Sequence, residues 1–258
     1  MKNKLSTYWR NRCIEETQKQ FDVSYEELNE QLRKVYKYSS NKIKREIEDL
    51  YFKLLEDDLR ATDIWTYKHY RDLEKSLTTQ IVALGDKEIK IYNKGLEKAL
   101  KDVYKGTSVP NNREFGIIND YAVRQMLYTT WSKKHYSSAI WDNKELMLSR
   151  LKKGITESVV LGKSKDKAII DIMTECNKSF SDSDRLVRTE LMHTLNQGKS
   201  QKYKDSGLKL IEFVCVEDER LCSSCMEHDG EYVELEGADL PPWHPRCRCT
   251  FVPVVDWG

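Results

Sequence analysis

Near its carboxyl end the chain contains Cys222-Ser-Ser-Cys225, and after eighteen residues it continues with His244-Pro-Arg-Cys247. In each segment two residues separate a pair of metal-binding donors. Two donors on one tight turn reach the same ion, so two such turns supply the four ligands of a tetrahedral zinc ion. The spacing therefore predicts a zinc site formed by Cys222, Cys225, His244 and Cys247.

The fourth ligand has an alternative in Cys249, because both sulfurs would point to the same side of an extended strand. We favour Cys247 because it shares the two-residue gap with His244. His228 follows Cys225 closely, but we interpret it as a surface histidine in a turn. The remaining cysteines are predicted to be small apolar core residues: Cys13, Cys176 and Cys215.

We expect this zinc to be structural. The first residues are charged and contain no apolar run, so they do not form a secretory signal, and a reducing compartment disfavours the alternative of two disulfides. Four protein donors fill the coordination shell, whereas a catalytic zinc keeps one position open. Glu227 and Asp229 are the nearby candidate bases, but Asp229-Gly230 is typical of a tight turn that enters a strand. The sequence therefore predicts no catalytic residues and no enzyme.

The charges are unevenly distributed. The 258 residues include 43 basic and 42 acidic side chains, but residues 211–258 contain eleven acidic residues and three arginines, a net charge of −8. The preceding 210 residues have a net charge of +9. Zinc modules that bind nucleic acid are usually basic, so contact with DNA is expected only of the basic part. No apolar run approaches the ~18 residues of a membrane span, so no membrane partner is expected.

The rest of the chain is predicted to be helical. Apolar and small residues recur every three or four positions, the spacing of a narrow helical seam: Phe21, Tyr25, Leu28, Leu32, Val35, Ser39, Ile43, Ile47, Leu50 and Leu54. This seam predicts one or two long helices over residues 8–59. Two alternatives stay open: the seam packs on its own chain, or it pairs with a second copy.

Further patterns predict a mainly α fold with a small carboxyl-terminal antiparallel β module that binds zinc (α+β). Helices are expected over 65–84, 86–104, 114–136, 143–161 and 165–176. Ser181-Asp-Ser-Asp184 is expected to cap one more helix, which runs to residue 204. Strands are expected over 208–216 and 251–255, with Pro253 indicating an edge. The aromatic residues at helical spacing are predicted to be core: Tyr121, Tyr128, Trp131, Tyr136 and Trp141.

The predicted division has three parts. Residues 1–110 form long helices for interaction, residues 111–207 form a helical core, and residues 208–258 form the zinc module.

From Arg185 onward the chain resembles the phage head morphogenesis or minor head proteins related to the F protein of phage Mu. The resemblance covers about seventy residues in order and spacing, and it includes these segments: Arg185-Leu-Val-Arg188-Thr-Glu190, Gly198, residues 203–207, Val216-Glu-Asp218-Glu-Arg-Leu-Cys222-Ser-Ser-Cys225, Asp229-Gly230 and Pro241-Pro-Trp-His244-Pro-Arg-Cys247-Arg-Cys249-Thr.

The resemblance implies a structural minor capsid protein of a tailed phage or prophage, present in few copies inside the head at the portal vertex. It implies assembly in the host cytoplasm, the portal and capsid proteins as partners, and a role in head assembly, with DNA packaging or ejection as an added role. The basic helical part is then expected to contact packaged DNA, and the acidic module to contact protein.

Arg188 and Glu190 have two interpretations. One is a catalytic role, since some proteins of this kind carry toxin enzymes such as ADP-ribosyltransferases, usually as an added domain. We favour the other, a partly buried charge network that braces a helix against the sheet. For the whole protein the alternatives are a metal-dependent nuclease of head assembly and a nucleic-acid-binding zinc protein of the host.

Overall fold

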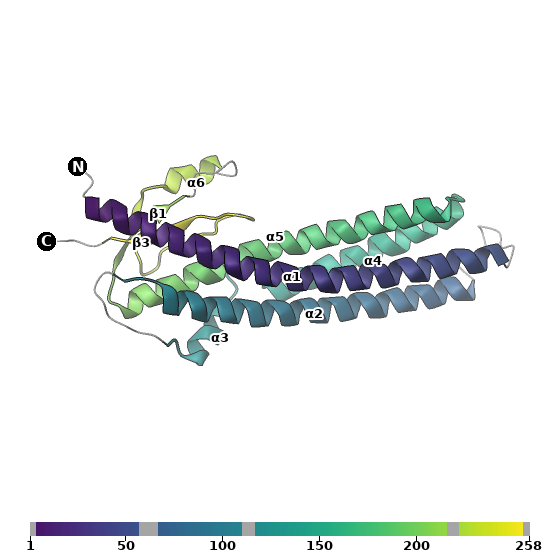
Figure 1. Cartoon of the computed structure of the whole chain (residues 1–258), viewed down its shortest axis with the longest axis horizontal. Helices are drawn as coiled ribbons and strands as arrows, with labels where there is room; N and C mark the ends of the chain where they lie inside the picture. The colour runs from purple at the N-terminus through teal and green to yellow at the C-terminus, as the bar shows by residue number, and fades with distance from the viewer. Residues whose placement is uncertain (1–3, 57–66, 110–116, 216–221, 255–258) are drawn as a thin grey trace. The chain divides into compact units, whose positions relative to one another are not determined.

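The structure is a computed structural model that describes residues 4–56, 67–109, 117–215 and 222–254, without the side chains of residues 4–6 and 9. Its elements, labelled in Figure 1, are α1 (Lys4–Glu56), α2 (Lys68–Gly106), α3 (Asp120–Tyr128), α4 (Tyr136–Val160), α5 (Lys165–Asp205), β1 (Leu210–Val214), α6 (Ser223–His228), β2 (Tyr232–Glu234) and β3 (Thr250–Pro253). The predicted fold class, mainly α with a small antiparallel sheet near the carboxyl end, is confirmed.

The chain divides into two compact units. The sheet unit comprises Met1–Leu28, Tyr92–Lys133 and Arg185–Gly258, and the helical unit comprises Asn29–Ile91 and Lys134–Asp184. The helices α1, α2 and α5 each supply residues to both units. The division predicted at residues 110 and 207 stays a prediction.

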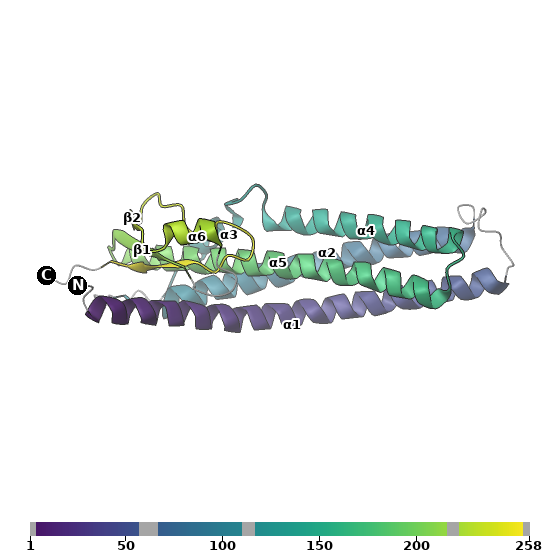
Figure 2. The same cartoon turned by 90° about the horizontal axis from the view of Figure 1, so that it is seen from above.

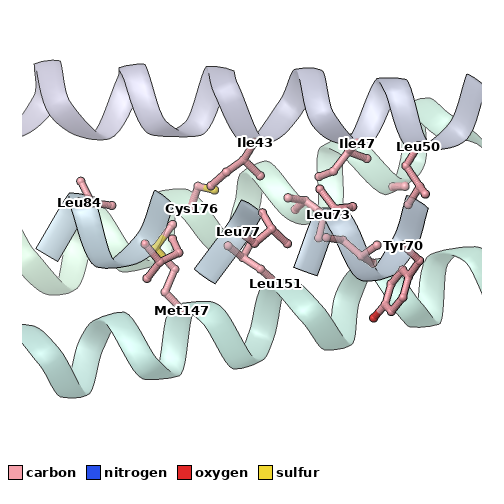
Figure 3. Packing of buried hydrophobic residues seen from close by; sticks show 14 of the residues in the cluster. Ile43, Ile47, Leu50, Tyr70, Leu73, Leu77, Leu84, Met147, Leu151 and Cys176 are labelled. Atoms are coloured by element: carbon pink, nitrogen blue, oxygen red, sulfur yellow. The ribbon is translucent and has the colours of Figure 1, made fainter. Parts of the chain in front are cut away.

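The core of the helical unit comes from four helices, whose apolar side chains point toward one another in Figure 3. Ile43 and Ile47 of α1 are fully buried, in agreement with the predicted seam. They face Leu77 of α2 and Leu151 of α4. Figure 2 shows α4 turning back along α5, and Lys163 in the connecting turn binds Asp171 of α5 at 2.9 Å. Burial of this apolar stripe, at ~25 cal/mol per Å², is the main favourable term in folding the unit.

The predicted break between 65–84 and 86–104 is wrong, because α2 continues through Gly85. A Cβ at Gly85 would lie 2.7 Å from the ring of Trp141 on α4. The glycine therefore permits the close approach of an indole and does not end the helix.

The helix start predicted at Ser181–Asp184 is also wrong, because α5 is continuous from Lys165 to Asp205. Ser183 is fully buried, and its Oγ lies 2.6 Å from the hydroxyl of Tyr36. It also donates to Glu88. Ser183 therefore takes part in a tertiary hydrogen-bond network. A Ser-Asp-Ser-Asp segment alone does not show whether its serines cap a helix or form tertiary hydrogen bonds.

This network contains a fully buried ion pair. Lys144 Nζ lies 2.8 Å from Glu88 Oε2, and the two side chains are 1% and 0% exposed. The Tyr36 hydroxyl donates to Glu88 at 3.0 Å, and Lys144 also donates to this hydroxyl. Burial lowers the pKa of Lys144, and the charge of Glu88 opposes that change. Such a pair is strongly interdependent, because removal of one partner leaves a buried charge without compensation.

The sheet unit contains a three-stranded antiparallel sheet in the order β2-β1-β3. Val214 of β1 and Val252 of β3 pack on Cys13 of α1. The ladder pairs Ile211 with Pro253 and Val214 with Thr250, so Pro253 ends an edge strand as predicted. Helix α5 approaches α2 closely at Gly198, where a Cβ would lie 2.5 Å from Val103.

The helix predicted over 114–136 is shorter in the structure. Residues 110–116 lie outside the described residues, α3 ends at Tyr128, and α4 begins at Tyr136 after a nonhelical segment. Tyr121 and Tyr128 are 70% and 63% exposed, so their prediction as core residues is wrong. None of the helices in the four described segments combines the length and the apolar character that a membrane span requires.

We expect Lys144→Met to destabilise the protein by about 3–5 kcal/mol, because Glu88 is left buried without a partner. The double variant Glu88→Met/Lys144→Met should be within about 1–2 kcal/mol of the parent, since both charges are removed together. Urea unfolding measures both values. As a control, Lys153→Met removes an exposed lysine whose pairing with Glu157 contributes less than about 1 kcal/mol. Equal costs for Lys144→Met and Lys153→Met would contradict the interdependence.

Candidate metal centre

The first pair of donors lies at the start of α6. Cys222 is the N-cap residue of this helix, and its Sγ accepts a hydrogen bond from Cys225 N at 3.4 Å. A helical turn at this point brings the two sulfurs to one side. Cys225 is buried, and Cys222 is partly exposed.

The second pair lies on a tight turn before β3. Cys247 N donates to His244 O at 3.1 Å, and Arg246 between them has a positive φ of 66°. Arg246 N donates to Thr189 Oγ1 of α5 at 3.0 Å. The turn is therefore held by the long helix as well as by its own backbone.

The donor atoms lie close together, and one pair of sulfurs has the spacing of a tetrahedral site. The sulfurs of Cys225 and Cys247 are 3.8 Å apart, and His244 Nε2 lies 3.0 Å from Cys225 Sγ and 3.3 Å from Cys222 Sγ. Bonds of ~2.3 Å to sulfur and ~2.0 Å to nitrogen place tetrahedral ligands about 3.5–3.8 Å apart. The sulfur pair fits this spacing, and the nitrogen–sulfur pairs are slightly shorter.

His244 is oriented for coordination. Its Nδ1 lies 2.9 Å from Pro245 O, so a proton on Nδ1 is donated to that carbonyl and Nε2 faces the two thiols. Metal-binding histidines commonly donate their second ring nitrogen in this way. Burial disfavours the charged ring, but the Pro245 carbonyl and the sulfurs of Cys247 and Cys222 raise the pKa of His244 overall.

The donors form two groups, and within each group all ligand atoms lie within 4.8 Å of one another. The first contains Cys222, Cys225 and His244, and the second contains Cys225, Cys247 and Cys249. The five predicted donors thus fall into two groups of three that share Cys225, and Cys247 belongs to the group without Cys222 and His244. The predicted set of four ligands stays a prediction. A hydrogen bond from Cys249 lowers the pKa of Cys247 to about 5, while burial raises that of Cys225 to about 12.

One more cysteine lies beside the predicted donors. Cys215 was expected to be an isolated core residue, but its side chain clusters with Cys225, Cys247 and Cys249. It follows β1 directly, and its Sγ donates to Cys225 O at 2.8 Å. In sequence, the only indication was its place at the end of a strand that leads into the first donor pair. Cys13 and Cys176 are buried in other clusters, as predicted.

Asp229 and Gly230 connect α6 to β2. Asp229 Oδ1 accepts a hydrogen bond from Cys215 N at 2.8 Å, and Gly230 has a φ of 80°. The left-handed backbone at Gly230 explains the residue type, because glycine adopts it without steric cost. Asp218 lies outside the described residues. His228 is partly exposed, contacts Glu231 at 2.9 Å and packs its ring against Trp243, and it is in neither group of donors.

Arg188 and Glu190 contact different neighbours. Arg188 donates to the hydroxyl of Tyr25 at 2.7 Å and stacks over its ring. Glu190 is 6% exposed and accepts a hydrogen bond from Trp131 Nε1 at 3.1 Å. Trp131 in turn stacks on His193 with ring centroids 4.2 Å apart. The predicted role of these residues in bracing the sheet stays a prediction.

Burial shifts both ionisable groups beside Trp131. It raises the pKa of Glu190 to about 7 and lowers that of His193 to about 3. Among the described residues, His193 Nδ1 is a buried atom without a hydrogen-bond partner. The pocket therefore favours a neutral carboxyl and a neutral imidazole.

A family model described as "Phage Mu protein F like protein" matches residues 149–252. The matched span includes α5, all of the sheet except Pro253, the five predicted donors and Cys215. The resemblance predicted from the sequence is thus confirmed over these residues. Comparisons with curated proteins and with solved structures give no match.

We expect Glu190→Gln to change the pH dependence of stability. The pKa of Glu190 is higher in the folded state than the ordinary value of 4.5, so its contribution to stability is fully present below pH ~4.5 and is lost as the pH rises through about 7. Glutamine keeps the acceptor for Trp131 but does not ionise. At pH 8 the variant should be more stable than the parent by on the order of 2 kcal/mol, and at pH 5 the gain should be much smaller.

Denaturant unfolding at both pH values measures this difference. His193 is present in both proteins, so its contribution to the pH dependence of the free energy of unfolding largely cancels from the difference between them. An unchanged difference between pH 5 and pH 8 would contradict a raised pKa.

Proposed function

We propose that this protein is a structural minor head protein of a tailed phage or prophage, and that zinc stabilises its carboxyl-terminal module. The observation that supports this proposal is the coincidence of two features in one segment. The match to the phage Mu F-like family spans residues 149–252, and the same span contains the converging thiol and imidazole donors.

Zinc fits the donors because it accepts mixed thiolate and imidazole ligands in a tetrahedron. We assign Cys222, Cys225, His244 and Cys247 as its ligands. Cys247 is preferred to Cys249 because it shares a tight turn with His244, in which Cys247 N donates to His244 O at 3.1 Å. Four protein ligands leave no open position for water, so the proposed ion is structural and no enzyme activity is assigned.

The energetic reason for an ion lies in the small size of the sheet. Its strands contain five, three and four residues, and the buried apolar cluster beneath them has only five members. A structural zinc ion of this kind contributes about 10–16 kcal/mol of binding free energy, which couples directly to folding.

The proposed place of action is the interior of the head at the portal vertex, with the portal and capsid proteins as partners. Residues 1–210 have a net charge of +9, which suits sequence-independent attraction to packaged DNA. Residues 211–258 have a net charge of −8 and would be repelled by DNA, which suits contact with protein. Within this proposal, residues 1–110 serve interaction, including self-association, and residues 111–207 and 208–258 form the helical core and the zinc module.

We expect His244→Ala to lower the zinc content and to destabilise the protein by about 4 kcal/mol or more, because loss of a metal site is among the largest single-residue effects. His228→Ala is the matched control, since His228 is a nearby histidine that contacts Glu231 instead of the donors. Elemental analysis and thermal unfolding of reduced protein measure both effects. Equal zinc content and equal unfolding temperatures in the two variants would contradict the assignment.

The location is tested by assembling heads with a tagged copy of the chain and determining an asymmetric reconstruction of them. Density for the tag is expected inside the head beside the portal and at no other vertex. Heads assembled with the His244→Ala chain should contain less of it, whereas His228→Ala should be incorporated normally. Tagged chain that is absent from purified heads, or spread evenly over the shell, would contradict the proposal.

A further inference from the structure

The metal centre contains more donors than one tetrahedral ion requires. Cys215 and Cys249 remain after Cys222, Cys225, His244 and Cys247 have been assigned to the proposed zinc ion. Cys215 is 6% exposed and Cys249 is 3% exposed, and both belong to one cluster with Cys225 and Cys247.

The sheet register places these two cysteines opposite each other. The β1–β3 ladder pairs Phe213 with Phe251 and Val214 with Thr250, and the next pair in this register is Cys215 with Cys249. Val254 N donates to Leu210 O, so Leu210 and Val254 form a hydrogen-bonded pair. Along an antiparallel ladder, hydrogen-bonded and non-hydrogen-bonded pairs alternate. Cys215 and Cys249 then occupy a non-hydrogen-bonded pair, in which the Cα atoms are only ~4.5 Å apart and the side chains leave the same face.

Contacts among the sulfurs extend from this pair to the first site. Cys249 hydrogen-bonds to both Cys215 and Cys247 through its side chain. Its sulfur also lies within 4.8 Å of the sulfurs of Cys225 and Cys247. Cys225 is the sulfur common to the two groups of donors, and the sulfur of Cys247 lies 3.8 Å from it. Cys222 and His244 complete the first group, Cys247 and Cys249 complete the second, and Cys215 adjoins the second through its hydrogen bond with Cys249.

We propose that the centre binds two thiophilic divalent ions, the second held by Cys215, Cys249, Cys225 and Cys247. This inference rests on the proposed zinc site, because Cys225 and Cys247 are shared between the two ions. Six donors with two of them shared give each ion four ligands, the number that zinc prefers. The second position has only sulfur ligands, which select soft ions such as zinc and cadmium over magnesium or calcium.

The charges also balance. One divalent ion with three thiolates and a neutral imidazole has a net charge of −1. Binding of the second ion replaces the protons of the Cys215 and Cys249 thiols, so two protons are released and two thiolates are added. Two ions with five thiolates again give −1. The second ion therefore adds no net charge to a buried site, and net buried charge is the main energetic objection to such a cluster.

Asp229 connects this position to the rest of the module. Its carboxylate accepts a hydrogen bond from Cys215 N, which fixes the backbone of a proposed ligand at the point where β1 ends. Asp229 thereby acts as a positioning residue for the second ion.

The test uses the full chain, purified with reductant and loaded with zinc. Elemental analysis should give about two zinc ions per chain in the parent and about one in Cys215→Ser. Cys176→Ser is the matched control, because Cys176 is a buried cysteine in the core of the helical unit, and it should keep the parent ratio. A ratio of about one in all three proteins would overturn the second site but would leave the proposed zinc site intact. A ratio near zero in the parent would overturn both.

A second measurement needs no variant and so does not depend on whether Cys215→Ser folds. In the parent loaded with cadmium-113, two resonances are expected, one from an ion with only sulfur ligands and one from an ion with a nitrogen ligand. Coupling between them through the shared sulfurs is also expected. A single resonance would overturn the proposal. So would a Cys215–Cys249 disulfide, detected by peptide mapping of freshly purified and alkylated protein.

Discussion

The position of the second donor turn depends on Asn196, a fully buried residue of α5. Its Nδ2 donates to Pro241 O at 2.8 Å and to Cys249 O at 3.0 Å, and its Oδ1 accepts from Thr250 Oγ1 at 2.9 Å. One amide thus joins the segment before His244 to the first residue of β3. A buried amide with all three bonds in place is favourable, whereas a partial set would leave polar groups without partners. The donors are therefore positioned by a rigid helix, and the short strands need not do so alone.

Lys199, one turn farther along α5, continues this contact. It is buried, and its ammonium group donates to Thr17 Oγ1 of α1 and to Thr250 Oγ1. Burial lowers its pKa to about 8. Asn196 and Lys199 both form hydrogen bonds with Thr250, the first residue of β3. Helix α5, which lies within the matched residues, therefore holds the start of this strand. Direct contacts within the sheet unit thereby link the helix, the strand and the donor turn.

Much of this arrangement could be predicted from sequence because its determinants are local. The spacing of Cys222, Cys225, His244 and Cys247 identified two donor turns, and the apolar seam identified α1. Predictions failed where a residue with a familiar local preference has a tertiary role instead. Gly85 accommodates an indole and Ser183 joins a buried network, so neither marks a helix boundary. Cys215 was missed because strand register, which no single sequence segment specifies, places it opposite Cys249.

The contact between Gly85 and Trp141 limits how the helical unit can vary. The glycine has no side chain because the indole occupies that space, and the indole fits only because the glycine is there. Neither position is free to change alone: a methyl group on α2 would push α4 away, and a small residue on α4 would leave a void against α2. In related chains the residues at these two positions should therefore change together: a larger side chain on α2 should be accompanied by a smaller one on α4.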